Sequence, residues 1–150
     1  MASTVVPRRS RRHKRTRISP EEHLARLIQD SSYCVFVTGA GLSTNSGIRD
    51  YRGPNGIWTE AAKHGAKEGD AGVWCESMYA SIPAASPTMA HMAIAKLANA
   101  GYVKQVISQN EDGLHLRSGL RRALISEIHG NDFIELCANK ACRAEACAVI

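Results

Sequence analysis

The sequence predicts an α/β fold in which helices flank a mostly parallel sheet. Short apolar runs, typical of buried parallel strands, alternate with longer segments whose apolar residues recur at helical spacing. Polar or glycine-containing segments follow the apolar runs directly, as expected at the carboxyl ends of parallel strands. The chain has 150 residues, of which 44% are apolar and 22% charged, so it can hold one globular domain of ordinary composition.

The first predicted helix begins after Ser19 and runs to about Asp30. Ser19 is a capping residue, Pro20 suits the first helical position, and Glu22 stands three residues after the cap, where it completes a capping box. The run Tyr33–Val37 is rich in aromatic and β-branched residues, and we expect it to form a buried strand of the parallel sheet.

The middle of the chain is less regular. Residues 53–86 lack periodicity and are rich in Gly, Pro and Ala, which predicts a long mobile segment with short helical pieces. A second helix is expected to start at the capping residue Ser86 and to stop at Gly101. Three further strands are predicted at residues 103–107, 124–128 and 133–137.

Positive charge is concentrated at the N-terminus. Residues 1–17 hold seven Arg or Lys residues and no acid, whereas the rest of the chain has twelve bases and fourteen acids. Because such a block lacks an apolar face, residues 1–17 are predicted to be a disordered basic arm. The arm favours a nuclear or nucleolar location and non-specific contact with nucleic-acid phosphates through residues 8–17; a solvated tail without function is the alternative.

Composition also excludes two classes of protein. No apolar run is long enough to cross a bilayer, so no membrane contact is expected, and the N-terminus lacks the apolar stretch of a secretory signal. The five cysteines are an odd number without such a signal, which argues against a disulfide framework. Three of them, Cys137, Cys142 and Cys147, fall in the last fourteen residues, and this clustering favours a metal site.

Three polar segments follow predicted strands, at residues 39–43, 108–112 and 128–130. Gly39 and Gly41 in the first segment would let the backbone approach an anion closely, and an expected helix after them would aim free N–H groups at it. Glycine turns after strands are common, however, and Thr44 stands where the third glycine of a dinucleotide fingerprint belongs. On these glycines alone, a tight structural turn is therefore the better explanation.

The longer segments around these positions resemble the three signatures of the sirtuin family, in the order in which the family has them. The first spans residues 39–43 and 47–52, the second residues 108–115, and the third residues 127–130. The resemblance covers residues 20–137, and residues 50–59 and 110–119 are most similar to the nuclear and nucleolar branch of the family. It implies a partial Rossmann-like parallel sheet with flanking helices, followed by the start of a small zinc-binding module.

The resemblance also implies a chemistry, that of an NAD-dependent protein-lysine deacylase. Such an enzyme breaks the bond between the nicotinamide and the ribose of NAD, and the carbonyl oxygen of the acyl-lysine captures the anomeric carbon. The products are deacylated lysine, nicotinamide and an O-acyl-ADP-ribose. The substrates would be proteins with acylated lysines, such as histones or nucleolar proteins. Two alternatives stay open: a truncated non-catalytic product that binds nucleic acid or a partner, and a mono-ADP-ribosyltransferase.

Eleven positions match cofactor-binding residues of the family: Gly39, Ala40, Gly41, Ser43, Ile48, Asp50, Tyr51, Arg52, Gln109, Asn110 and Asp112. By this resemblance the glycine turn and its serine hold the pyrophosphate and the adjoining ribose, while Ile48 and Asp50 line the nicotinamide pocket. Tyr51 would shield the reactive carbon from water, and Arg52 would neutralise the charge of a phosphate. The members of the second signature would bind the nicotinamide ribose and its neighbours.

The catalytic residues implied by the resemblance are His129, as the general base, and Asn110. A histidine suits a general base because its ordinary pKa of about 6.5 leaves it largely neutral at cellular pH. Other interpretations stay open for single residues. Asn110 would stabilise a loop, Asp50 would cap a turn, and His91 and His115 would be structural or lie at the surface.

The chain departs from the family pattern at two places. The family usually has Pro where this chain has Arg49, a flexible cation that would loosen the cofactor loop or disturb its pocket. The family binds one structural zinc ion with two Cys-x-x-Cys pairs. Here Cys137 and Cys142 are the candidate ligands, Lys140 stands where a cysteine is expected, and the second pair does not follow. Free cysteines without a metal are the alternative interpretation, and the residues favour it. We therefore expect residues 18–150 to be the N-terminal portion of a sirtuin catalytic domain, ending within the zinc module.

Overall fold

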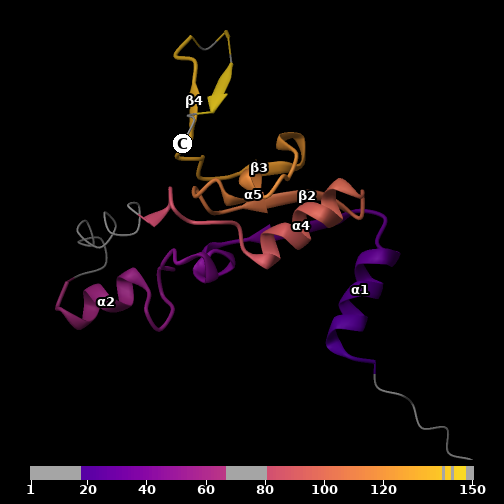
Figure 1. The fold of residues 1–150 in the computed structure, drawn as a ribbon, viewed down its shortest axis with the longest axis horizontal. Helices are drawn as coiled ribbons and strands as arrows, with labels where there is room; N and C mark the ends of the chain where they lie inside the picture. Colours follow the sequence, from indigo (N-terminus) through magenta and orange to yellow (C-terminus); the bar gives the residue numbers. More distant parts are fainter. Residues whose placement is uncertain (1–17, 67–80, 140, 143, 148–150) are drawn as a thin grey trace, which may run out of the picture. The chain divides into compact units, whose positions relative to one another are not determined.

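The computed structural model of the chain describes residues 18–66, 81–139, 141–142 and 144–147 (Figure 1). The chain divides into two compact units, with their boundary between Asp30 and Ser31. The predicted basic arm lies outside the described residues, as does the central part of the predicted mobile segment. Within the described ranges, no helix is both long enough and apolar enough to cross a membrane.

The first unit contains helix α1 (Pro20–Asp30), which confirms the first predicted helix. The Ser19 hydroxyl accepts a hydrogen bond from the Glu22 backbone N–H at 3.1 Å, so the cap satisfies one of the free donors at the helix start. The Glu22 carboxylate accepts a hydrogen bond from Arg26, one turn later, at 2.9 Å. An exposed pair of this spacing adds only about 0.3–0.5 kcal/mol, so the cap contributes more to the helix than the ion pair.

A three-stranded parallel sheet lies at the centre of the second unit. Its strands are β1 (Cys34–Thr38), β2 (Val103–Ser108) and β3 (Ile125–Glu127), with β2 in the middle. The predicted α/β fold with a parallel sheet is therefore confirmed.

Strand β1 is buried on one face only. Cys34 and Phe36 pack against the core, whereas Val35 and Val37 are 38% and 69% exposed. Successive side chains of a strand point to opposite faces of its sheet, and only one of these faces meets the core. The prediction of a fully buried strand is therefore wrong for Val35 and Val37.

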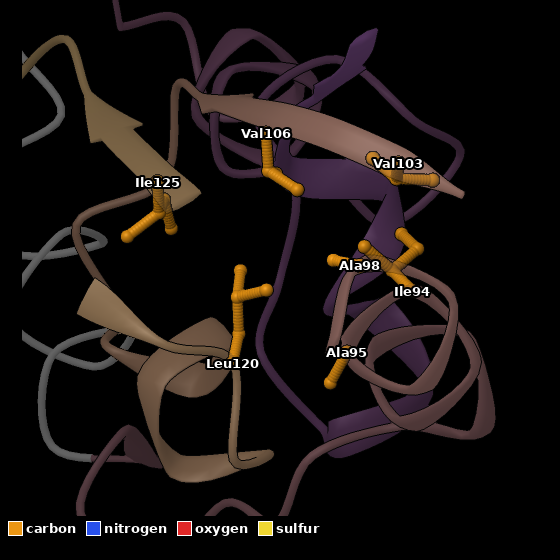
Figure 2. Packing of buried hydrophobic residues seen from close by; sticks show 7 residues of the cluster. All are labelled: Ile94, Ala95, Ala98, Val103, Val106, Leu120 and Ile125. Atoms are coloured by element: carbon orange, nitrogen blue, oxygen red, sulfur yellow. The ribbon is translucent and has the colours of Figure 1, made fainter. Parts of the chain in front are cut away.

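Helix α4 (Met89–Asn99) covers the core face of the sheet. Its Ile94, Ala95 and Ala98 meet apolar side chains of the strands and of the segment before β3, and together they form the main hydrophobic core (Figure 2). The other fully buried members of this core are Val103, Val106, Leu120 and Ile125.

The cap of α4 is Thr88, not the predicted Ser86. The Thr88 hydroxyl accepts a hydrogen bond from the His91 N–H at 3.3 Å, and the Thr88 N–H donates to His91 Nδ1 at 3.2 Å. This reciprocal pair fixes the helix start two residues later than expected, because an imidazole here takes the place of the usual Glu or Gln of a capping box. The Ser86 carbonyl instead accepts a hydrogen bond from the Ser46 hydroxyl.

A second hydrophobic cluster lies among the loops that follow the strands. It consists of Ile48, Ile57, Ile82, Ala85 and Leu114. Two of these residues begin the short helices α2 (Ile57–Lys63) and α5 (Leu114–Arg117). Helix α2 is one of the predicted short helical pieces, whereas α5 was missed because four residues are too few to show a helical period.

The fourth predicted strand does not join the parallel sheet. Strand β4 (Ile134–Leu136) pairs antiparallel with β5 (Glu145–Cys147) in a separate two-stranded sheet. A parallel neighbour needs a crossover of a dozen or more residues, and the chain between β3 and β4 is too short for one. The strand predicted at residues 133–137 is therefore confirmed, but it belongs to a separate sheet.

Candidate functional site

The three polar segments meet at the carboxyl ends of the parallel strands. Gln109, just after β2, donates its backbone N–H to the Thr38 carbonyl at the end of β1, at 3.0 Å. Ile128, just after β3, donates its N–H to the Ser108 carbonyl at the end of β2, also at 3.0 Å. The first residues beyond each strand are thus fastened to the neighbouring strand, at the edge where open parallel sheets bind their ligands.

The glycine turn after β1 forms two short 3₁₀ turns. They are η1 (Ala40–Leu42) and η2 (Thr44–Ser46), each closed by backbone bonds between residues three apart. Gly47 then adopts a left-handed backbone, with φ of 85°, which ends the second turn. The α-helix expected after Gly41 is therefore wrong.

Ser43 connects the glycine turn to the second signature. Its side chain is buried, and its hydroxyl donates to Asp112 Oδ2 at 2.6 Å. Asn110 Nδ2 donates to Ser43 Oγ at 3.1 Å and to the Gly39 carbonyl at 3.2 Å. Asp112 Oδ1 accepts the Leu114 N–H at 2.9 Å, so this carboxylate also starts helix α5. Four of the predicted site residues therefore form one hydrogen-bonded group.

Two buried histidines lie close to this group. His115 and His91 are 2% and 0% exposed, and they hydrogen-bond at 2.8 Å to the hydroxyls of Thr38 and Thr88, respectively. Burial lowers the pKa of His91; burial, followed by the charge of His91, lowers the pKa of His115 to about 4. Both rings are thus neutral parts of the interior, and the surface alternative is wrong. No periodicity in the sequence indicated that these two histidines meet.

The loop that carries Asp50 is closed by its own hydrogen bonds. Asp50 Oδ1 accepts the Gly53 N–H at 2.9 Å, and the Asp50 carbonyl accepts the Ile57 N–H at 2.8 Å. The Trp58 N–H donates to the Tyr51 carbonyl at 2.9 Å. The carboxylate of Asp50 thus caps a turn, which was the structural alternative for this residue.

Arg49 fastens the same loop. Its Nε donates to the Asn55 carbonyl at 2.9 Å, across six residues of chain. The rings of Tyr51 and Trp58 stack nearby, with centroids 6.4 Å apart. The guanidinium thus supplies a cross-link at the position where the family has a rigid Pro.

The site residues line a pocket of about 370 Å³, a volume in the range of small-molecule sites. The residues of its wall are Ala40, Tyr51, Arg52, Trp58, Gln109, Asn110 and His129. All of these except Trp58 were predicted site residues. Trp58 lies within the segment that resembles the nuclear branch, and its stacking on Tyr51 is a contact that the sequence did not indicate.

A smaller recess of about 40 Å³ shares Ala40, Tyr51, Gln109 and Asn110 with the pocket. The remaining residues of its wall are Ser43, Ile48, Arg49, Ile82, Glu111, Asp112 and Asp132. Three carboxylates line this recess, and burial, followed by the charge of Asp112, raises the pKa of Asp132. The predicted residues Gly39, Gly41 and Asp50 line neither hollow; Gly39 and Asp50 support the walls through the bonds described above.

His129 is exposed at the pocket wall with one nitrogen engaged. Its Nδ1 lies 3.0 Å from the Gln109 carbonyl oxygen. A carbonyl can only accept a hydrogen bond, so Nδ1 carries the proton of the neutral ring and Nε2 keeps its lone pair. This tautomer leaves Nε2 able to take a proton from a bound molecule.

The predicted metal ligands lie in the β4–β5 hairpin. Cys137 and Cys142 are both exposed and both free thiols. The Cys137 N–H pairs with the Ala144 carbonyl, whereas Cys147 stands opposite Ile134, further along the strands. Within the part of the chain that the structure describes, no group of three or more His, Cys, Asp or Glu side chains could hold a metal ion.

Comparisons with curated proteins identify several relatives of this chain. It is 50% identical over 126 residues to the NAD-dependent protein deacetylase SRT1 of Arabidopsis thaliana and 49% identical over 124 residues to the NAD-dependent protein deacetylase Sirt6 of Drosophila melanogaster. It is 43% identical over 135 residues to the NAD-dependent protein deacetylase sirtuin-7 of Homo sapiens. These alignments cover 83%, 83% and 86% of this chain but 24%, 36% and 31% of the relatives, so the chain spans about a quarter to a third of their length.

The fold agrees with solved structures. A Sir2 structure with a deacetylated p53 peptide and 3'-O-acetyl ADP-ribose superposes with a TM-score of 0.64 at 31% identity, and a Sir2 structure with a p53 peptide and NAD+ with 0.62 at 30%. The alignments cover 84% and 87% of this chain and 52% and 53% of those chains. A family model described as the Sir2 family matches residues 39–148. The matched residues include all three polar segments and the pocket that they form, and the chain belongs to the Sir2 family, the sirtuins.

Proposed function

We propose that the protein is an NAD-dependent protein-lysine deacylase and that this chain supplies its NAD-binding and catalytic residues. The observation that carries the proposal is the pocket in which Asn110 and His129 meet Tyr51 and Arg52. All four residues stand at positions that match the sirtuin signatures. Relatives that are 43–50% identical to the chain are deacetylases by name, which supports the same activity here.

NAD would supply a nicotinamide–ribose bond whose cleavage leaves a positively charged carbon for the acyl oxygen to capture. His129 suits the role of general base, because its Nδ1 proton is held by the Gln109 carbonyl and its Nε2 can accept the proton of a ribose hydroxyl. Tyr51, stacked on Trp58 at the pocket wall, suits a shield that keeps water from the reacting carbon. Arg52 in the same wall offers a guanidinium to phosphate oxygens.

The glycine turn and the recess would make the remaining predicted contacts with NAD. Gly39, Ala40 and Gly41 would place backbone N–H groups of the first 3₁₀ turn near the pyrophosphate. The recess walled by Ile48 and Asp112 adjoins the pocket, and its residues would contact the nicotinamide end of NAD. Asp50 would contribute to the nicotinamide site by holding the loop that it closes.

We also propose a structural zinc ion at the β4–β5 hairpin, with Cys137 and Cys142 as two of its ligands. The support is the resemblance to the family and the exposure of both thiols near one turn. Tetrahedral zinc takes four ligands, so the described residues supply half of the set and the others have to come from elsewhere. Metal analysis of the purified protein tests this: one zinc ion per chain is expected, and Cys137→Ser should lose it.

For the location, we propose the nucleus, including the nucleolus. The support is the basic block within residues 8–17 and the similarity to the nuclear branch of the family. There the substrates would be acylated proteins such as histones or nucleolar proteins, and the block would contact nucleic-acid phosphates without sequence preference. A fluorescent fusion with and without residues 1–17 tests the location. If both forms were distributed equally between nucleus and cytoplasm, the proposed targeting role of residues 1–17 would be wrong, and the proposed deacylase activity would be unaffected.

A calorimetric NAD titration of the chain tests the main proposal. Saturable binding is expected for the wild type, weaker binding for Asn110→Ala, and unchanged binding for His129→Ala, because His129 acts on a proton rather than on affinity. Release of nicotinamide with an acetylated histone peptide then distinguishes a deacylase from an ADP-ribosyltransferase, which would label the protein instead. Absence of NAD binding together with salt-sensitive RNA binding would favour the non-catalytic alternative.

A further inference from the structure

A buried carboxylate precedes His129 by two residues and has no part in the roles given above. The side chain of Glu127 is only 4% exposed. Its Oε1 accepts a hydrogen bond from Asn131 Nδ2 at 2.6 Å. Its Oε2 has no hydrogen-bond partner among the described residues and lies 3.4 Å from Arg122 Nη1. A carboxylate so deeply buried costs stability unless its neighbours compensate the charge, so its place in the turn calls for an explanation.

The bond between Glu127 and Asn131 spans the candidate general base. The two residues flank His129 at equal distance along the chain, and the Gly130 N–H donates to the Glu127 carbonyl at 3.2 Å inside the same turn. Gly130 has φ of 101°, a backbone that other residues rarely adopt. The turn that presents His129 is thus closed twice, once by its backbone and once by these side chains.

The orientation of the Asn131 amide is fixed by a second bond. Asn131 Oδ1 accepts the Phe133 N–H at 2.9 Å, so its Nδ2 has to be the atom that faces Glu127. The Glu127 oxygen therefore receives a true donor. Loss of the carboxylate would leave that donor buried without an acceptor, and the turn would relax around His129.

Arg122 links this turn to the hairpin. Its guanidinium forms a fork with the Glu145 carboxylate on β5, from Nε to Oε2 at 3.0 Å and from Nη2 to Oε1 at 3.1 Å. The third nitrogen, Nη1, faces Glu127. Burial raises the pKa of Glu127, while the Asn131 bond and the Arg122 charge oppose that rise. Arg122 thus favours the ionised form of a carboxyl group that burial would otherwise neutralise.

We propose that Glu127 is a positioning residue for His129: its carboxylate holds the 127–131 turn through Asn131, and Arg122 compensates its charge and couples the turn to β5. The inference rests on the proposed function, since it assigns a role to the base of that reaction. The held turn keeps His129 Nδ1 against the Gln109 carbonyl, which selects the tautomer with a free Nε2. Without the bridge the imidazole ring samples both tautomers, and fewer molecules carry the base in its reactive form.

The test compares Glu127→Leu, which removes the acceptor for Asn131, with Asn131→Ala and Arg122→Met in the 150-residue chain. Nitrogen NMR of the His129 ring, assigned with His129→Asn, reports its tautomer without any NAD. A single tautomer protonated at Nδ1 is expected for the wild type, and a mixture for Glu127→Leu and Asn131→Ala. Arg122→Met should give a smaller change, and Arg121→Met, the exposed neighbouring arginine, should give none.

Turnover gives the second measurement. Glu127→Leu should lower kcat about tenfold or more, because a base that is misplaced loses its rate advantage, while the KM for NAD stays within about twofold. The pH profile of kcat should shift with it, which a loss of general stability would not produce. An unchanged His129 tautomer in Glu127→Leu and Asn131→Ala would overturn the inference. If Glu127→Leu does not fold, Asn131→Ala and Arg122→Met decide in its place, because the Arg122 side chain is partly exposed and can be shortened without opening the core.

The two measurements also separate this inference from the function on which it rests. If the wild-type protein shows the single tautomer but neither binds NAD nor deacylates peptides, the positioning role of Glu127 stands and the proposed function is wrong. If the protein is active but none of the three substitutions changes the His129 tautomer, the proposed function stands and the positioning role is wrong.

Discussion

His91 and His115 meet edge to face in the interior of the second unit, with ring centroids 4.9 Å apart and an interplanar angle of 67°. One nitrogen of each ring bonds to a threonine hydroxyl, and the other has no partner among the described residues. Two protonated imidazoles at this separation would repel each other, and burial adds a desolvation cost. The packing therefore requires both rings to be neutral.

We expect the stability of the chain to fall as the pH drops below about 6.5. Burial, followed by the charge of His91, lowers the pKa of His115 to about 4, whereas histidine in an unfolded chain titrates near 6.5. Between these values the unfolded chain binds more protons, so the free energy of unfolding rises with pH, by at most about 1.4 kcal/mol per unit for one histidine. Thermal melts between about pH 5 and about pH 7.5 measure this slope.

The source of that slope can be assigned by substitution. His115→Gln keeps a polar group near Thr38 but removes the titration, so its melts should depend less on pH. His23 is exposed on α1, and His23→Gln should keep the wild-type slope. If His115→Gln followed the wild type at every pH, the neutral-pair interpretation would be wrong.

Ser43→Ala should destabilise the chain by about 1–3 kcal/mol. The substitution removes the donor to the buried Asp112 carboxylate and leaves that oxygen without its hydrogen bond. Thr44 is the matched control, since its hydroxyl makes an exposed bond to the Gly41 carbonyl. Urea unfolding of both variants measures the difference. Equal losses for Ser43→Ala and Thr44→Ala would show that the buried bond contributes no more than an exposed one.

Arg49→Met should release the loop that carries Asp50 and Tyr51. The lost bond to the Asn55 carbonyl is worth about 1 kcal/mol, which predicts about fivefold weaker NAD binding by calorimetry. Trp58 emission, in a chain where Trp74 is replaced by Phe, should change as well, because Trp58 stacks on Tyr51. Unaltered emission and affinity would mean that the backbone bonds alone hold the loop.

Gly56→Ala should destabilise the same loop by about 1–3 kcal/mol through overpacking. A Cβ at Gly56 would lie 2.6 Å from the carbonyl carbon and oxygen of Tyr51 and 2.7 Å from the backbone nitrogen of Arg52. Backbone atoms cannot move aside as a flexible side chain would. A Cβ at Gly41 would meet nothing within 4 Å, so the melting temperature of Gly41→Ala should stay close to that of the wild type. Equal melting temperatures for Gly56→Ala and the wild type would contradict the steric argument.

The sequence predicted the convergence of the site because that convergence follows from strand direction. Polar segments after parallel strands share one edge of the sheet, so Asn110 and Ser43 had to be neighbours once their strands were parallel. The cap of α1 was predictable for a similar reason, since Ser19 and Glu22 act within one turn. The cap of α4 was not, because it depends on an imidazole at His91 that also packs against His115.

Long-range side-chain contacts account for most of what the sequence did not indicate. Arg122, Glu127 and Glu145 are charged residues of ordinary types, and nothing in their spacing shows that they share one cluster. The same holds for Arg49: the sequence did not reveal that the Asn55 carbonyl lies within reach of its guanidinium.

The hydrogens of the Ser43–Asn110 group restrict what a ligand can offer to it. The single hydroxyl proton of Ser43 points to Asp112, and both protons of the Asn110 amide are taken, by Gly39 and by Ser43 itself. Only lone pairs remain on these two side chains, on Asn110 Oδ1 in the pocket wall and on Ser43 Oγ in the buried wall of the recess. Lone pairs attract hydroxyl hydrogens and repel phosphate oxygens. The lone pair that Asn110 Oδ1 keeps therefore suits a hydroxyl donor better than a phosphate oxygen.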